Sequence, residues 1–191
     1  MAFAVTGAFK AIEKKSDIVG ILLLATITGV AGGTMRDVIL GDFPNSLTDL
    51  AYVEITVVFG IVIFFLYSHL KKHWNLFLKF DAIGLDVFAI IGVTFAYNLF
   101  GLNFLAILLA GMLIAVGVIL RDVFVNQVPI VFVKEFYVFA SFVGIVIFYL
   151  ILYFGGELYY ATIAGRVITT SLRLVAMKYD WNLPKAKGSI D

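Results

Sequence analysis

The stretch "GVAGGTMRDVILGDFP", residues 29–44, decides how the rest of this chain is interpreted. It ends an apolar run long enough for a membrane helix, yet it contains a cluster of glycines, an adjacent arginine and aspartate, and a final proline. Glycine and proline both weaken helical geometry, and charges are costly in hydrocarbon. The segment therefore differs from the end of an ordinary membrane helix.

The composition predicts an all-α, polytopic membrane protein. Of 191 residues, 62% are hydrophobic and only 14% are charged, and the mean hydropathy is +1.05. A spanning helix needs about 20 mostly apolar residues. Seven hydrophobic runs follow one another, at residues 1–12, 18–40, 50–69, 80–100, 103–125, 134–154 and 157–177, and the first is too short to span alone. The absence of cysteine excludes disulfides and thiolate metal sites.

Lysine and arginine are distributed unevenly over the predicted loops. With seven spans, 12 of the 14 positive residues fall on one face, whereas Arg36 falls on the other and Arg166 lies inside the last span. By the positive-inside rule, the C-terminus is cytoplasmic and the N-terminus is outside. The residues on the cytoplasmic face are Lys10, Lys14, Lys15, Lys71, Lys72, Lys79, Arg121, Lys134, Arg173, Lys178, Lys185 and Lys187.

The chain repeats itself after 85 residues. In this register "RDV" at residues 36–38 falls on "RDV" at residues 121–123, Gly32 falls on Gly117, and Pro44 falls on Pro129. Residues 1–69 give 15 identities, where roughly five or six are expected by chance. We expect a single transmembrane domain over residues 1–191, with repeat one at 1–69, repeat two at 80–154 and an extra helix at 157–177. Each repeat holds three spans, so the two repeats are expected to be inverted in the membrane.

Glycines recur in the second and fifth spans, which are equivalent under this repeat. In one interpretation, Gly29, Gly32, Gly33, Gly111 and Gly117 simply allow close helix packing. In the other, they kink the two spans, and the unwound carbonyls around residues 28–32 and 115–117 line a polar pathway. The matching positions favour the second interpretation, although the fifth span is poorer in glycine.

The duplicated Arg-Asp pairs are Arg36 with Asp37 and Arg121 with Asp122. Neighbouring residues on a helix do not face each other, so we expect each charge to find its partner on another helix or in the opposite repeat. Snorkelling to the interface is the simpler alternative. Duplication favours a structural lock or a gate, and the prolines of the two repeats are interpreted as helix stops.

Five further polar positions carry weaker signals. Asp86 and Glu54 lie early in their spans and can reach the interface, and Asp86 is alternatively a buried charge within its span. Arg166 shares a helical face with Thr169, Thr170 and Arg173, so we expect a buried charge that faces the bundle or an oligomer contact. His69 and His73 fit an interfacial belt better than a metal site. No phosphate-binding loop or hydrolase motif is present, so we expect neither an enzyme, nor a cofactor, nor a nucleic-acid partner.

Four stretches together carry a family resemblance: "AFAVTGA", "GVAGGTMRDVILGDFP", "LRDVFVNQVP" and "LRLVAMKYDWNLP". They resemble the prokaryotic branch of the trimeric intracellular cation channel (TRIC) family, which overlaps a bacterial family of predicted glycine transporters. The resemblance implies homotrimers of seven-span subunits. In each subunit, kinked second and fifth helices line a pore for monovalent cations such as potassium. It also favours a prokaryotic plasma membrane, with lipids as the surrounding partner.

The resulting hypothesis is a potassium-permeable channel with a pore in each protomer. Carbonyls and the hydroxyls of Thr26, Thr28 and Thr34 would line the path, the Arg-Asp pairs would anchor or gate it, and the only metals would be transient potassium or sodium. The alternative is a secondary carrier of glycine or another small zwitterion, whose carboxylate would bind half-helices that begin near Thr34 and Ile119. A purely structural scaffold is disfavoured, because broken helices and duplicated charges are costly in a membrane.

Overall fold

Residues 1–133, 136–179 and 181 are described by the computed structural model, and these residues form helices and turns without a strand. The helices are α1 (Ala2–Glu13), α2 (Ile18–Ile39), α3 (Asn45–Thr48), α4 (Ala51–Leu70), α5 (Trp74–Phe100), α6 (Phe104–Leu113), α7 (Val116–Phe124), α8 (Ile130–Val133), α9 (Phe136–Tyr153) and α10 (Leu158–Tyr179), with a short 3-10 helix, η1 (Lys71–His73), before α5. The all-α expectation is therefore confirmed.

Helices occupy all seven predicted spans, but they differ in length and apolarity. Within the described residues, three segments are long and apolar enough to cross a membrane: Ile18–Ile39, Ala51–Leu70 and Phe104–Phe124, which joins α6 and α7. Shorter apolar helices cover Asp86–Phe100 and Val138–Tyr153. The chain is thus an integral membrane protein, whereas seven crossings remain a prediction.

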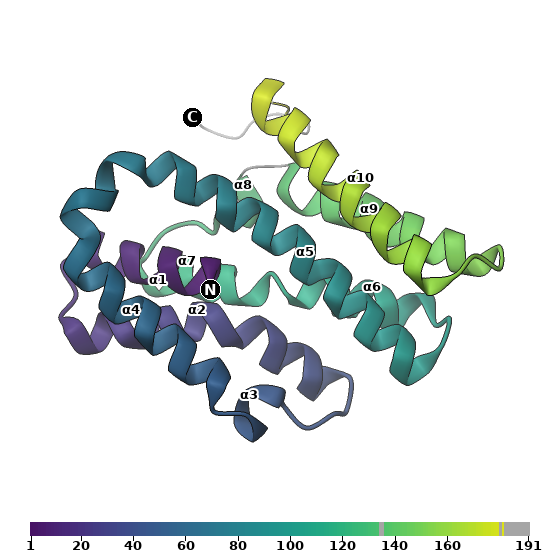
Figure 1. Ribbon diagram of the computed structural model, residues 1–191, viewed down its shortest axis with the longest axis horizontal. Coiled ribbons are helices and arrows are strands. Elements are labelled where there is room, and N and C mark those ends of the chain that lie inside the picture. Colours follow the sequence, from purple (N-terminus) through teal and green to yellow (C-terminus); the bar gives the residue numbers. More distant parts are fainter. Residues whose placement is uncertain (134–135, 180, 182–191) are drawn as a thin grey trace, which may run out of the picture.

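Each half of the chain packs its own apolar core. Phe9, Ile21 and Ile63 are buried where α1, α2 and α4 meet, and Ile90 and Phe148 are buried where α5, α6, α9 and α10 meet. Figure 1 shows α9 and α10 together at one edge, with α1, α2 and α7 in the interior and the N-terminus near the middle of the molecule. Packing of α2 against α7 joins the two halves.

The same turn ends α2 and α7, and it is not made by proline. Gly41 and Asn126, which are 85 residues apart, adopt left-handed φ values of 75° and 55°. The next residue in each case bonds back to the helix, from the Asp42 N–H to the Asp37 carbonyl and from the Gln127 N–H to the Asp122 carbonyl, both at 2.9 Å. A left-handed residue is a common helix terminator. The expectation that proline stops these helices is wrong, because Pro44 and Pro129 instead precede the short helices α3 and α8.

The helix break is in the fifth span and not in the second. α2 is continuous over 22 residues and passes through all its glycines, so the predicted unwinding at residues 28–32 is wrong, as is a half-helix that begins near Thr34. A helical glycine costs only about 1 kcal/mol relative to alanine, less than freeing a backbone group in hydrocarbon. Ile114 and Ala115 interrupt the fifth span between α6 and α7. Neither residue is a helix breaker, so tertiary packing places the interruption.

Candidate functional site

α2 and α7 cross with their backbones in close contact at two equivalent glycines. A Cβ on Gly32 would lie 2.5 Å from the carbonyl oxygen of Ile114, and a Cβ on Gly117 would lie 2.5 Å from that of Thr28. Any larger residue would therefore have to displace the backbone of the partner helix. At these two positions the packing interpretation of the glycines is correct.

The remaining predicted glycines divide into packed and open positions. A Cβ on Gly29 would lie 2.5 Å from Thr56 Cγ2, and one on Gly111 would lie 2.5 Å from Ile145 Cδ1. Gly33, in contrast, has open space where a Cβ would be. Gly33 is therefore the position where the absence of a side chain leaves room for something other than protein.

That space belongs to an open cavity of about 420 Å³ lined by the start of α1, by α2, α3 and α5, by the start of α4 and by Ile114. Seven predicted site residues line it: Thr28, Gly29, Gly32, Gly33, Thr34, Arg36 and Asp37. Five others do not belong to its lining: Thr26, Gly111, Gly117, Arg121 and Asp122. The cavity thus gathers the repeat-one part of the predicted site.

Several residues of the cavity lining were not predicted from the sequence. Asn45 and Ser46 reach the cavity from the loop and short helix after Pro44, and Phe88 and Phe95 reach it from α5. The sequence did carry a signal for Asn45 and Ser46, because two polar residues follow Pro44 between two predicted spans. The phenylalanines carried no such signal in a chain with 19 of them.

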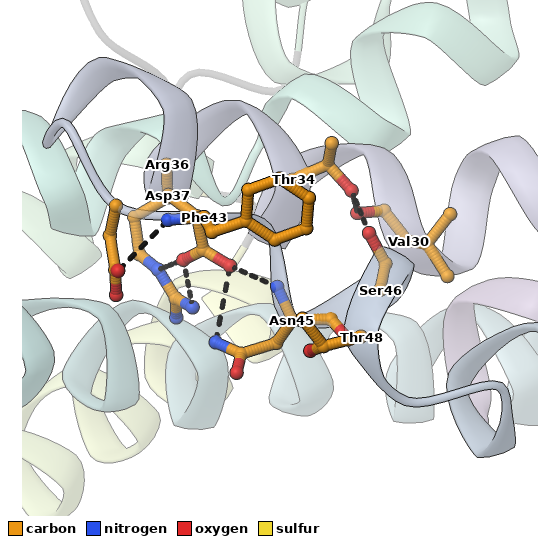
Figure 2. Close-up of polar contacts among 9 residues, drawn as sticks. Val30, Thr34, Arg36, Asp37, Phe43, Asn45, Ser46 and Thr48 are labelled. Carbon is orange, nitrogen blue, oxygen red and sulfur yellow. Dashed lines mark hydrogen bonds and ion pairs between the residues drawn. The ribbon is translucent and has the colours of Figure 1, made fainter.

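Arg36 and Asp37 both belong to the cavity lining, and Figure 2 shows the polar contacts that they make. Arg36 donates to Asp37 from its Nε at 2.8 Å, so the expectation that the two neighbours do not face each other is wrong. The rule that neighbours do not face each other applies to short side chains, whereas the arginine side chain is long enough to fold back. The expected contacts with other helices are also made, since Asn45 donates to Asp37 and Arg121 donates to Thr6 of the opposite repeat. The other oxygen of Asp37 accepts from the backbone N–H and the side-chain amide of Asn45, at 3.0 and 3.2 Å. Asp37 therefore ties α2 to α3.

Repeat two contains the same lock. Arg121 donates to Asp122 from its Nε at 2.8 Å, and Asp122 accepts from the backbone N–H of Ile130 at 2.9 Å. Ile130 is equivalent to Asn45 in the 85-residue register. The arginines differ in their further contacts: Arg121 donates to the Thr6 hydroxyl at 2.9 Å, whereas the Arg36 guanidinium lies 4.3 Å from the centre of the Phe95 ring.

The hydroxyl protons around the cavity are directed into the protein. Thr28 donates to the Leu24 carbonyl at 2.6 Å, and Thr34 donates to the Val30 carbonyl at 2.9 Å. The Thr34 and Ser46 hydroxyls lie 2.6 Å apart (Figure 2). Because Thr34 has only one proton, both contacts are satisfied when Ser46 donates to Thr34. The lone pairs of these oxygens are then left for whatever occupies the cavity.

Charge at the cavity is balanced as well. Asp37 accepts from Arg36, and it also takes both the backbone and side-chain N–H groups of Asn45. Two N–H groups of Arg36 and two of Asn45 are thus bonded to Asp37, while the hydroxyl oxygens remain as acceptors. Such a lining suits a cation that has lost part of its water shell. Among the described residues, no group of acidic or histidine side chains forms a fixed metal site.

A second buried charge cluster attaches α10 to the rest of the protein. Asp86 is fully buried, accepts from the Ser141 hydroxyl at 3.2 Å and lies 3.7 Å from the Arg173 guanidinium. Asp86 is thus the buried charge that the sequence predicted, and Arg173 is its partner.

Arg166 is exposed on the single protomer, so it does not face the bundle, whereas the expected oligomer contact stays a prediction. The buried stripe of α10 runs through Gly165, Thr169 and Arg173, every fourth residue. Such a row is inclined to the helix axis, and Arg166 falls one residue outside it. Several other predicted positions lie outside the description: residues Lys134, Lys185 and Lys187, and the side chains of His73 and Lys79.

Comparison with known proteins gives consistent matches. The family model described as Glycine transporter matches residues 1–68 and 78–153. The UPF0126 inner membrane protein YadS of Escherichia coli K12 is 33% identical over 187 residues, which cover 95% of this chain and 89% of YadS. The UPF0126 membrane protein YvgT of Bacillus subtilis strain 168 is 34% identical over 151 residues, which cover 77% of this chain and 74% of YvgT.

Solved structures of TRIC channels share the whole fold. One, solved to explain conductance through TRIC cation channels, has a TM-score of 0.90 and 30% identity and covers 100% of this chain and 94% of its own. The trimeric TRIC orthologue of Rhodobacter sphaeroides has a TM-score of 0.85 and 31% identity, and the match covers 94% and 93% of the two chains. A prokaryotic TRIC channel crystallised in 0.5 M KCl has a TM-score of 0.83 and 32% identity, with coverage of 95% and 93%.

Proposed function

Since the chain belongs to the Glycine transporter family and, with it, to the prokaryotic branch of the TRIC cation channels, we propose that it conducts monovalent cations, potassium among them, through a pore in each protomer. The observation that carries the proposal is the cavity lining. Thr28, Thr34 and Ser46 offer oxygen lone pairs, and Arg36 and Asn45 both donate to Asp37.

The comparisons do not favour a glycine carrier, because the matched solved structures are cation channels. α2 also offers no half-helix whose N-terminus could bind that carboxylate, because it is continuous through Thr34. The protein is not an enzyme either, since its relatives are cation channels and membrane proteins.

The proposal includes an arrangement in the membrane. Two inverted three-helix repeats, at residues 1–69 and 80–154, carry the path, and α10 is the added seventh span. Three such protomers form a homotrimer in a prokaryotic plasma membrane, in contact with lipids, with the N-terminus outside and the C-terminus in the cytoplasm. In this orientation the end of the cavity near Asn45 and Ser46 faces outward. Recurrence of the Asp37 contact at Asp122 supports the repeat, and the trimeric relative supports the assembly.

Single-channel recording from the reconstituted protein tests this function. We expect potassium currents far above the turnover of a carrier, with a reversal potential under bi-ionic potassium and sodium that ranks the two ions. Thr34→Val combined with Ser46→Ala removes two lining acceptors and should lower the potassium conductance. Thr162→Val is the matched control, because the Thr162 hydroxyl bonds to its own helix on α10, away from the cavity. Saturable glycine uptake without current would contradict the proposal.

A further inference from the structure

The repeat-two counterparts of the cavity residues are apolar. In the 85-residue register, Gly33 corresponds to Val118, Thr34 to Ile119 and Ser46 to Val131. If the two repeats contribute equivalent halves of one path, the second half therefore has a different lining from the first. The structure shows what these counterparts do.

They fill the space that their repeat-one equivalents leave open. Val118 is completely buried and Val131 is nearly so, and both belong to one apolar cluster with Phe3, Ile114 and Ala115, against which Ile119 packs. Phe3 and Ile114 also line the cavity. The cavity therefore ends on this cluster.

Polar contacts resume beyond the cluster along α1 and α7. Thr6 lies one turn after Phe3 along α1, and Arg121 lies one turn after Val118 along α7. Arg121 donates a hydrogen bond to the Thr6 hydroxyl. One further turn along α1, Lys10 donates to the side chain of Gln127. The cluster is thus a thin apolar layer between a polar cavity and a polar layer on the other side.

We propose that Phe3, Ile114, Val118 and Val131 form a hydrophobic gate of the conduction path and that this gate is closed in the structure. The inference rests on the proposed function. An ion cannot shed its water to cross a dry apolar layer, and such a constriction conducts only when it widens enough to become wet. The gate opens when α7 and α8 move away from α1.

The break between α6 and α7 is placed to allow that movement. Ile114 and Ala115 interrupt the span at the level of the cluster, and Ala115 itself belongs to the cluster. Both residues keep right-handed helical dihedral angles, so α7 continues the direction of α6 and can tilt about this interruption. α2, which carries the repeat-one lining, is continuous and has no equivalent hinge.

Replacing gate residues by their own repeat-one counterparts tests the gate. Val118→Gly and Val131→Ser should each raise the open probability of single channels by roughly tenfold or more, a change equivalent to about 1.4 kcal/mol. Val93→Ser is the control, because Val93 is completely buried in the separate core of α5, α6 and α9. An increase in both gate variants but not in the control supports the gate. If the wild type conducts and both gate variants have its open probability, the gate is overturned and the proposed function stands. If the wild type and all three variants form intact trimers but carry no current, both the gate and the proposed function are overturned.

Thiol labelling gives a second readout that does not depend on how well the gate variants open. The chain has no cysteine, so a single introduced thiol reports its own accessibility. In vesicles exposed to a water-soluble thiol reagent on both faces, Ser46→Cys should react rapidly in every condition. Val131→Cys should react at least about tenfold more slowly in closed channels and accelerate as the open probability rises. Equal rates at the two positions in closed channels overturn the gate.

Discussion

The two halves of this chain keep the same scaffold and differ in what that scaffold encloses. In both, the aspartate of the Arg-Asp pair accepts from a backbone N–H eight residues later, and a glycine contacts the backbone of the opposite half. In repeat one the scaffold encloses a cavity with hydroxyl oxygens, whereas in repeat two it is filled by valine and isoleucine. Duplicated features therefore report on folding, and divergent features report on function.

The largest effect is expected from breaking the lock, and it should differ between the halves. Asp122→Asn leaves the Arg121 guanidinium buried beside an uncharged amide, and loss of one partner of a buried ion pair costs about 3–5 kcal/mol of folding stability. Asp37→Asn should cost less, because Arg36 borders the cavity, where water can solvate it, and rests on Phe95. Thermal unfolding of the two variants in detergent measures the difference. Equal losses would contradict the assigned asymmetry.

The next effect tests the glycine crossing, where the halves should behave alike. Gly32→Ala and Gly117→Ala each place a Cβ 2.5 Å from a backbone carbonyl oxygen. Overpacking of this kind costs typically about 1–3 kcal/mol, so both variants should lower the melting temperature by similar amounts. Gly33→Ala is the matched control on the same helix, because a Cβ there meets nothing within 4 Å. A loss at Gly33 as large as that at Gly32 would show that glycine in α2 serves something other than this contact.

These cases show how far the sequence could predict the site. The 85-residue register identified the equivalent charges and glycines, because identity at a fixed spacing does not depend on geometry. It could not predict that Arg36 bonds to its own neighbour, since that depends on the side-chain conformation of a long arginine and on Asn45, which begins the short helix α3. Nor could glycine content locate the helix break, because the break lies at Ile114 and Ala115, where packing against α2 decides it. Periodicity likewise could not tell Arg166 from Arg173, since the buried stripe follows an inclined row.

A smaller effect is expected at the attachment of α10, which only repeat two has. Asp86 and Arg173 lie 3.7 Å apart, and Asp86 is equivalent to Met1 in the register. In a double-mutant cycle of Asp86→Asn and Arg173→Gln, melting experiments should give a coupling free energy of about 0.5–3 kcal/mol. The same cycle with Arg166→Gln in place of Arg173→Gln is the control and should give additive losses. If the losses in the first cycle were additive, Asp86 would not be the partner of Arg173 that attaches α10.

The smallest expected effect concerns the aromatic ring that repeat one has in place of a hydrogen bond. The Arg36 guanidinium lies 4.3 Å from the centre of the Phe95 ring, whereas Arg121 bonds to Thr6. Phe95→Leu keeps an apolar side chain at the cavity but removes the attraction between cation and ring, which is worth about 0.5–1 kcal/mol at partly hydrated sites. A small drop in melting temperature is therefore expected, together with a changed single-channel conductance, because Arg36 gains freedom inside the lining. Phe88→Leu is the control, since Phe88 lines the same cavity but stacks against Phe3. If Phe95→Leu and Phe88→Leu changed the conductance equally, the Phe95 ring would act only through the volume that it occupies in the cavity. The different contacts of Arg36 and Arg121 would then have no part in conduction.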